Sequence, residues 1–370
     1  MNKRKARSGP ARTVPKVAKA DAAPGVRRQA TVIDVAEVAG VAVGTVSRYI
    51  NGHAIRTGNR DRIERAIAEL GYRRNLVASA MKTDVTHMVG LMVPALSEFH
   101  AGLLEQLSRR VRRTGRAVIS YSHDQDPHSI VEGLEFFASH RVDAVVMDGS
   151  GVPREQLAQY ANAGLNLVFY DNDVEGIPAD RVFVENRKAS ARAVNHLIEL
   201  GHERIATITG SLHNSAGALR YAGYRDALAA HNLMVDPQLV VEAHWREHEA
   251  YAGARDLLSL EDPPTAIFSA NYNMTIGMLA WMREHGLRTP RDVSLISFDD
   301  IPAFTVHEPG ITAVGQPVGK IADAITTLLA GRFASPAAMG RHTVTIDCDI
   351  ILRGSTRRLG RLEAVSAGAR

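Results

Sequence analysis

Apolar residues recur at helical spacing in three short segments near the start of the chain. The first segment begins at Thr31, which has capping-box spacing with Asp34, and ends at Gly40, whose conformational freedom suits a sharp corner. A second segment starts within three residues, and a third extends from about 61 to 70 and ends at Gly71. Their apolar positions are Val35, Ala36, Val38 and Ala39; Val43, Val46, Tyr49 and Ile50; and Ile63, Ala66, Ile67 and Leu70. The pattern predicts a compact three-helix unit.

The outward face of the second predicted helix is free for a partner. It carries small and hydrogen-bonding residues, namely Val43, Gly44, Thr45, Ser47 and Arg48. Hydroxyl groups suit phosphate oxygens, an arginine can donate two hydrogen bonds to guanine, and a valine can contact a thymine methyl. The pattern favours a DNA-binding unit, and the alternative is a helical hairpin inside a larger all-α domain.

From His87 onward, buried-strand runs alternate with amphipathic helices in two successive series. The strands are predicted at 87–93, 117–121, 143–148 and 165–170, then at 204–210, 239–243, 265–270 and 293–298. The helices are predicted near 100–114, 127–140 and 153–163, then near 187–200, 217–231, 247–259 and 273–285. Alternating strands and helices form parallel sheets covered on both faces. We therefore expect an α/β core of two doubly wound lobes, with a ligand cleft between them at the carboxyl ends of the strands.

Charge is divided unevenly along the 370 residues, which suffice for two or three domains. Residues 1–84 contain 17 Lys/Arg and 7 Asp/Glu, a net +10, so the other 44 − 17 = 27 basic and 40 − 7 = 33 acidic residues give −6. A basic head on an acidic body indicates a polyanionic partner for the head alone. Residues 1–30, with nine Lys/Arg, predict a disordered basic arm that adds salt-sensitive affinity. A solvated tail without a role is the alternative.

The remaining composition is that of an ordinary globular protein, with 45% hydrophobic and 23% charged residues. The single Cys348 excludes an intramolecular disulfide and fits a reducing compartment. No apolar run is long enough to span a bilayer, and no apolar block follows the basic start, so we expect a cytoplasmic location and no membrane partner. The sequence contains no G-x-S-x-G elbow, phosphate loop or Cys-His cluster, so we expect neither an enzyme nor a cofactor.

Six segments, in order, resemble the lactose/galactose-repressor type of bacterial transcription regulator. They are DVAEVAGVAVGTVSRYING (34–52), AIAELGYRRNLVASAMKT (66–83), HLIELGHERIATITG (196–210), YAGYRDAL (221–228), DVSLISFDDIP (292–302) and ILRGST (351–356). The resemblance implies an all-α helix-turn-helix headpiece, a hinge helix and a core like the periplasmic sugar-binding proteins. It also implies a homodimer or tetramer that binds double-stranded operator DNA.

The resemblance sets the domain boundaries that we expect. They are a basic arm at 1–30, the headpiece at 31–74, the hinge helix and linker at 75–86, the core at 87–358 and a flexible tail at 359–370. Within the core, the first lobe is expected at 87–171 plus 318–340, and the second at 172–317 plus 341–358.

Carried over position by position, the resemblance implies a set of DNA contacts. Val43 and Gly44 match the two main base-reading positions and Arg48 a third, while Thr45, Ser47 and Asn51 match backbone-contacting positions. In the hinge, Asn75, Ala78, Met81 and Lys82 are the matching residues, and Met81 replaces the usual wedging leucine. Ala42 replaces the usual serine N-cap of the recognition helix, and Gly44 weakens that helix further.

The resemblance also implies an effector site in the cleft. Arg220 matches an arginine that binds ligand hydroxyls or carboxylates, Trp245 matches a stacking aromatic residue, and Asn271 and Asp299 match sugar-binding polar groups. Tyr272 departs from the family, which usually has aspartate there. Further candidates at loops and strand ends are Ser97, Phe99, His100, His123 and Asp148, together with Asp171, Asn172 and Asn214. The implied function is a DNA-binding transcription regulator, with repression favoured, controlled by a sugar or sugar acid.

Two other functions compete with this one. His244, Glu247 and His248 form an H-x-x-E-H pattern found in inverted zinc metallopeptidases, but the motif straddles a strand end and a helix start. The core alone would also suit a transport-type sugar receptor without a DNA role. Operator binding by the intact protein discriminates between this receptor and the regulator.

Overall fold

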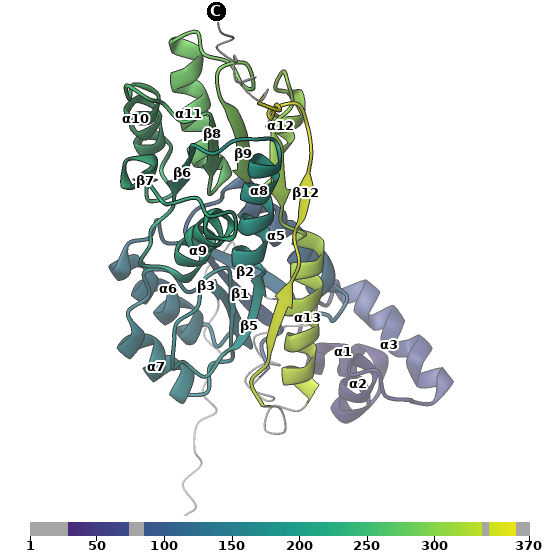
Figure 1. Cartoon of the computed structure of the whole chain (residues 1–370). Helices are drawn as coiled ribbons and strands as arrows, with labels where there is room; N and C mark the ends of the chain where they lie inside the picture. The colour runs from purple at the N-terminus through teal and green to yellow at the C-terminus, as the bar shows by residue number, and fades with distance from the viewer. Residues whose placement is uncertain (1–28, 74–84, 335–339, 360–370) are drawn as a thin grey trace, which may run out of the picture. The chain divides into compact units, whose positions relative to one another are not determined.

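The computed structural model describes residues 29–73, 85–334 and 340–359, and its contacts divide the chain into two compact units, residues 1–78 and 79–370 (Figure 1). Most of the expected basic arm and hinge helix, and the tail after residue 359, lie outside the described residues. Each unit is described below by itself.

The described part of the N-terminal unit consists of α1 (Val32–Ala39), α2 (Val43–Ile50) and α3 (Thr57–Leu70). The capping box is formed as predicted, since the Thr31 hydroxyl accepts the Asp34 N–H while the Asp34 carboxylate accepts the Thr31 N–H. Gly40 has the left-handed backbone, with φ of 62°, that the corner between α1 and α2 requires. The small core of this unit consists of Val35, Ala36, Ala39, Val46, Ile63 and Ala66.

Two details of this unit differ from the expectation. Val38, which we placed on the apolar face, is 47% exposed. The buried face of α1 consists of Val35, Ala36 and Ala39, and Val38 lies outside it. The third helix begins at Thr57 rather than near Asp61, so it starts about one helical turn earlier than the apolar periodicity indicates.

The first lobe of the core is a sheet of six parallel strands in the order β11-β5-β4-β3-β1-β2 (Figure 1). The strands are β1 (Met88–Val93), β2 (Ala117–Ser122), β3 (Ala144–Asp148), β4 (Leu167–Tyr170), β5 (Asp180–Val184) and β11 (Thr343–Ile346). Alternate residues of β3 pack on opposite sides: Val146 toward α5 (Glu98–Arg112) and α13 (Val318–Ala334), and Val145 toward α6 (Pro127–Ser139) and α7 (Arg154–Asn162). The sheet is therefore covered on both faces, as predicted.

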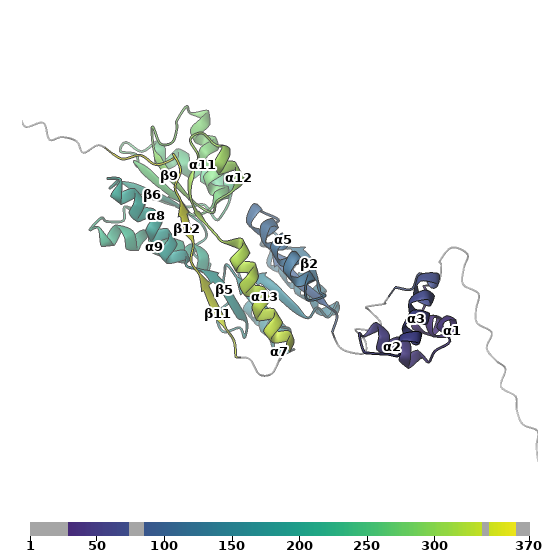
Figure 2. The same cartoon turned by 90° about the vertical axis from the view of Figure 1, so that its right-hand side faces the viewer.

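The second lobe repeats this plan with the order β12-β10-β9-β8-β6-β7. Its strands are β6 (Ile205–Thr209), β7 (Val240–Glu242), β8 (Ala266–Ser269), β9 (Ser294–Phe298), β10 (Thr312–Gly315) and the antiparallel β12 (Asp349–Ile351). Its helices are α8 (Asn186–Glu199), α9 (Ser215–Ala230), α10 (Glu247–Leu258), α11 (Tyr272–Glu284) and the short α12 (Pro302–Val306). Figure 2 labels three strands of this lobe, β6, β9 and β12, beside α8, α9 and α11. The predicted architecture of two doubly wound lobes is confirmed.

The expected lobe boundaries were wrong in two places. We placed the first crossing at residue 171, but β5 pairs in parallel with β4, so the first lobe extends to Val184. We placed 341–346 in the second lobe, but β11 pairs with β5 in the first sheet. The chain therefore crosses between the lobes after β5, between β10 and α13, and between β11 and β12.

Candidate functional site

The outer face of α2 is the exposed surface of the headpiece that the sequence singled out. Val43, Gly44, Ser47 and Arg48 are exposed and Thr45 is half-buried, whereas Val46 is fully buried in the small core. The helix begins at Ala42, whose methyl group cannot accept a hydrogen bond from the first turn. Asn51 is exposed and follows the last turn of α2. Asn75, Ala78, Met81 and Lys82 lie outside the described residues.

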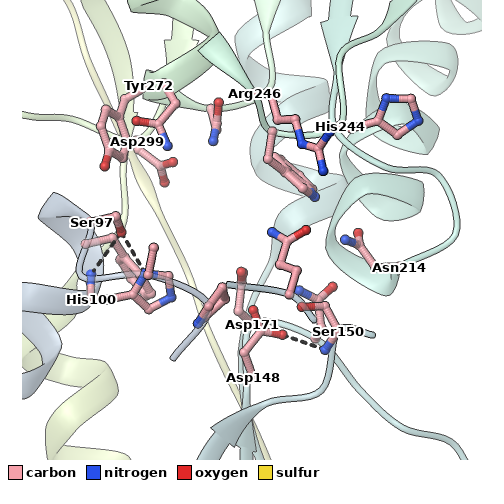
Figure 3. A pocket seen from close by; sticks show the side chains of 18 of the residues that line it. Ser97, His100, Asp148, Ser150, Asp171, Asn214, His244, Arg246, Tyr272 and Asp299 are labelled. Carbon is pink, nitrogen blue, oxygen red and sulfur yellow. Dashed lines mark hydrogen bonds between the residues drawn. The ribbon is translucent and has the colours of Figure 1, made fainter. Parts of the chain in front are cut away.

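A cavity of about 250 Å³ lies between the two lobes, where both sheets present the carboxyl ends of their strands (Figure 3). We call it the interlobe cleft. The first lobe contributes residues after β1, β2, β3 and β4, and the second lobe contributes residues after β6, β7, β8 and β9. The lining residues are Pro94, Ala95, Ser97, Phe99, His100, Asp124, Gln125, Asp148, Ser150, Asp171 and Asn172, then Asn214, Arg220, His244, Trp245, Arg246, Asn271, Tyr272, Asn273, Asp299 and Gln316.

Arg220 is the central cation of the cleft and is only 2% exposed. Its Nε donates to Asn186 Oδ1 at 2.8 Å, and Nη1 donates to the Ala270 carbonyl at 2.7 Å. The guanidinium carbon lies 3.8 Å from the centre of the Phe298 ring, which supports the plane from one side. With its orientation fixed in this way, the group faces two carboxylates, Asp171 at 3.5 Å and Asp299 at 3.9 Å.

Three carboxylates line the cleft around this buried arginine, and two of them, Asp171 and Asp299, lie within 4 Å of its guanidinium group. Asp148 and Asp171 end neighbouring strands β3 and β4, and Asp299 follows β9. Burial and the nearby Asp171 charge raise the pKa of Asp148 to about 7, although the Ser150 N–H donates to its Oδ1 at 2.8 Å. Burial also raises the pKa of Asp171, in spite of the opposing effect of Arg220. The inner cleft is thus rich in acceptors and has a surplus of acidic groups.

Asp299 is held as part of the cleft wall. Its backbone has a left-handed φ of 69°, and its Oδ1 accepts Nε2 of Gln316 at 2.7 Å. A helix-capping role is ruled out for the adjacent helix, because the N-cap of α12 is Ile301. Asn271 does act as a cap, since its Oδ1 accepts the Met274 N–H at 2.9 Å at the start of α11.

Trp245 forms the wall of the second lobe opposite Arg220, with its ring 5.4 Å from the guanidinium carbon. The chain reaches this position through two left-handed residues, His244 with φ of 46° and Trp245 with φ of 66°. Gly210 lies against the ring, and a Cβ at that position would be 2.2 Å from ring atoms. The glycine at the end of RIATITG therefore makes room for the indole.

The N-cap and first turn of α5 supply a neutral, largely apolar wall. Phe99 packs near Tyr170, and His100 Nδ1 lies 2.6 Å from Ser97 Oγ. Burial and the neighbouring His123 lower the pKa of His100 to about 4, so that imidazole is uncharged at neutral pH. Its Nε2 is buried without a hydrogen-bond partner among the described residues.

Comparisons with known proteins match both units. Residues 31–75 match the model for bacterial regulatory proteins of the lacI family, and residues 194–356 match the periplasmic binding protein-like domain. The HTH-type transcriptional repressor PurR of Haemophilus influenzae is 27% identical over 337 residues, covering 89% of this chain and 99% of that protein. The repressor CytR of Escherichia coli is 27% identical, covering 89% of this chain and 97% of that protein.

Solved structures agree with this relationship. A transcriptional regulator CelR–cellobiose complex is 29% identical with a TM-score of 0.67, covering 88% of this chain and all (100%) of that one. The lac repressor dimer bound to operator and the anti-inducer ONPF shares the fold, with a TM-score of 0.78 at 22% identity, covering 89% of this chain and 100% of that one. The chain joins a lacI-family DNA-binding domain to a periplasmic binding protein-like domain.

The two domain matches and the repressor relatives confirm the predicted class of function, a DNA-binding transcription regulator with a ligand-binding core. The structure brings together seven of the eight effector-site residues that the sequence singled out; they are Ser97, Phe99, Asp148, Arg220, Trp245, Asn271 and Asp299. Their roles remain predictions. The weaker candidates His100, Asp171, Asn172 and Asn214 also line the cleft.

His123 is the exception among the residues predicted for the effector site, since it does not line the cleft. It is 1% exposed, and its Nδ1 accepts the Gln125 N–H at 3.1 Å. The next two residues adopt left-handed conformations, with φ of 47° and 59°, and turn Asp124 and Gln125 toward the cleft instead. Sequence reasoning missed Gln316 and Arg246 as lining residues, and Asn186 as the group that orients Arg220.

The H-x-x-E-H pattern does not form a metal site. His244 precedes α10 and bonds to Glu249 at 2.7 Å, whereas His248 lies within the first turn and is exposed. Within the described residues, no group of three or more His, Cys, Asp or Glu side chains is arranged to hold a metal ion. Among the residues that the structure describes, no helix has the length and apolarity needed to cross a bilayer.

Proposed function

We propose that this protein is a cytoplasmic repressor that binds an operator as a homodimer. Its affinity for the operator would change when a small sugar occupies the interlobe cleft. The observation that carries the proposal is the pairing, in one chain, of an exposed recognition-helix face with a buried, pre-oriented Arg220 among hydrogen-bonding groups. A transport-type receptor does not require an exposed DNA-binding helix face. A DNA-binding protein that responds to no ligand does not require a buried arginine in a cleft.

On the DNA side, α2 is the proposed recognition helix. Arg48 and Val43 lie exposed on it and would contact guanine and a thymine methyl in the major groove. Thr45, Ser47 and Asn51 would bind phosphates and fix the register of the helix on the duplex. A dimer would place two such helices in successive major grooves, about one helical turn or more apart. The hinge residues Asn75, Ala78, Met81 and Lys82 are proposed to enter the minor groove.

On the ligand side, the cleft fits a polyhydroxylated compound. Asp148, Asp171 and Asp299 accept hydrogen bonds from hydroxyl groups, Arg220 donates them, and Trp245 offers an aromatic face to a sugar ring. The surplus of carboxylates around one buried arginine disfavours an anionic ligand, so we favour an uncharged sugar over the sugar acid that the sequence left open. The solved relatives include a cellobiose complex and a ribose complex, in keeping with this class.

Ligand binding would act on DNA through the relative position of the two lobes. Residues from both lobes line the cleft, so a ligand held between them favours one arrangement over another. A ligand shifts such an equilibrium only through unequal affinity for the two states. The site holds no arrangement of nucleophile and base that we assign to catalysis, and we infer that the protein is not an enzyme.

The test is operator selection by the intact protein. Full-length protein is incubated with a random duplex library, bound duplexes are recovered, and their affinity is compared with random competitor at fixed salt, with and without a panel of sugars. We expect a pseudo-palindromic sequence to be enriched and its affinity to change with a sugar. If the recovered duplexes show no shared sequence under any condition, the regulator assignment is wrong and the receptor alternative is favoured.

A further inference from the structure

Tyr272 reaches across the interlobe cleft from one lobe to the other. It is the first residue of α11 in the second lobe, and its hydroxyl accepts the backbone N–H of Glu98, the first residue of α5 in the first lobe, at 3.1 Å. The two residues are 174 positions apart in the sequence. The side chain lines the cleft but is only 9% exposed, so most of its ring lies against other protein atoms (Figure 3).

The contact occupies a group that a ligand could otherwise use. The first N–H groups of a helix have no partner within the helix, and they readily bind hydroxyl or anionic groups. In α5 the N–H of Glu98 is taken by Tyr272, and that of His100 points to Ser97 Oγ at 3.4 Å. These N–H groups at the start of α5 therefore already have partners within the protein and are not available to a ligand.

The seat of the Tyr272 ring is rigid. The preceding Asn271 caps α11 through its 2.9 Å bond to the Met274 N–H, which fixes the start of the helix. The ring belongs to the apolar cluster of the second lobe that also contains Met274, Met278 and Ile301. A side chain held at both its base and its tip cannot swing aside to admit a larger ligand without separating the lobes.

We propose that Tyr272 closes the α5 end of the cleft and thereby limits the effector to a single sugar ring. The inference rests on the proposed function, since it takes the cleft as the effector site. The cavity that remains, about 250 Å³, is below the roughly 300–1,000 Å³ usual for larger ligands. The related CelR is recorded with cellobiose, a two-ring sugar, so relatives at this level of identity do not fix ligand size.

Two substitutions separate ring volume from the hydroxyl contact. Tyr272→Ser removes the ring, and Tyr272→Phe keeps the ring and removes only the hydrogen bond to Glu98. Full-length wild type and both variants are titrated with matched one-ring and two-ring sugars (glucose with cellobiose, galactose with lactose, xylose with xylobiose) by calorimetry and thermal shift. We expect Tyr272→Ser to gain at least about tenfold in affinity for a two-ring sugar relative to its one-ring match. Wild type and Tyr272→Phe should both reject the two-ring sugars.

Three results would overturn the inference: comparable affinity of wild type for the two-ring sugars, no gain of any two-ring sugar by Tyr272→Ser, or an equal gain by both variants. Circular dichroism and ligand-free operator binding serve as folding controls. If Tyr272→Ser does not fold, Tyr272→Leu takes its place, because leucine has less volume and retains apolar packing. If wild type binds no operator, the proposed function is wrong. The sugar titrations test the role of Tyr272 independently of that result.

Discussion

Arg220 Nε donates to Asn186 Oδ1 at 2.8 Å, and both residues are almost fully buried. Asn186 is the first residue of α8, directly after the chain has crossed from β5 of the first lobe, and Arg220 lies in α9. The bond thus links the cation of the cleft to a crossing between lobes. The side-chain nitrogen of Asn186 has no partner among the described residues, so orienting Arg220 is its evident role.

Replacing Asn186 should therefore damage ligand binding without touching the cleft surface. In Asn186→Ala the buried Nε of Arg220 loses its acceptor, which should cost about 1–3 kcal/mol of unfolding free energy. Ligand-dependent stabilisation should fall, while operator affinity without ligand stays near that of wild type. Urea unfolding and thermal shift with the effector measure the two effects. Arg187→Ala, which removes an exposed ion pair with Asp226, is the matched control and should change both by little.

The raised pKa of Asp148 predicts a stability that falls as the pH rises. Its folded pKa of about 7 lies above the ordinary value of 3.8, so the folded protein retains a proton that the unfolded chain has lost between these values. Stability should decrease from about pH 4 to pH 7 and stay lower above it. Asp148→Asn should remove this decrease and stabilise the protein at pH 8, on the order of 2–4 kcal/mol.

Urea unfolding at pH 5 and pH 8 tests this prediction. Asp124→Asn, which removes an exposed carboxyl group from the lining of the same cleft, is the control for the loss of one negative charge. If Asp148→Asn shows the same pH profile as wild type, burial does not hold a proton on this carboxyl group.

We expect Arg48 to contribute to the discrimination between base pairs of the operator. Arg48→Ala is expected to cost about 1–3 kcal/mol of operator binding and to relax discrimination at one base pair of each half-site. Binding to a series of single-base operator variants provides the measurement. Arg62→Ala, on the exposed face of α3, should leave discrimination unchanged. Equal discrimination by Arg48→Ala and wild type would remove Arg48 from base recognition.

Helix α2 can be stabilised at its N-cap position, Ala42. Ala42 has the extended backbone of an N-cap, with φ of −67° and ψ of 144°, but no side-chain acceptor. Ala42→Ser supplies an acceptor for a first-turn N–H and should stabilise α2 by about 1 kcal/mol. Hydrogen exchange of the α2 amides should slow accordingly. Ala42→Val, which adds volume without an acceptor, should give no such protection; slowing in both variants would assign the effect to packing.

Sequence periodicity identified most of the regular elements of the core, but it identified neither the 17-residue helix α13 nor the strands β5, β10, β11 and β12. Strands such as β3 and β9 are continuous apolar runs, which identifies them directly. By contrast, β5 alternates buried and half-buried residues, the edge strand β11 has a single buried residue, and their pairing joins segments more than 150 residues apart. Local pattern cannot reveal such a pairing, and this is why the lobe boundaries were misplaced.

The same limit applies to the site. Residues at strand ends, such as Asp148 and Asp299, are brought to the cleft by the rule that parallel strands share one carboxyl edge. His123 obeys the same rule in sequence, yet its side chain points inward because the turn that follows it is left-handed. Asn186 carries no local signal, since its contact with Arg220 arises only from the packing of α8 on α9.

The final strands β11 and β12 are separated by two residues, yet each completes a different sheet. During synthesis, each sheet therefore lacks one edge strand until the same short segment near the end of the chain has been made. A product that stops before residue 343 would lack an outer strand in each lobe at once. Neither sheet can therefore be completed before the other, so a chain with one complete lobe and one incomplete lobe is not expected to form.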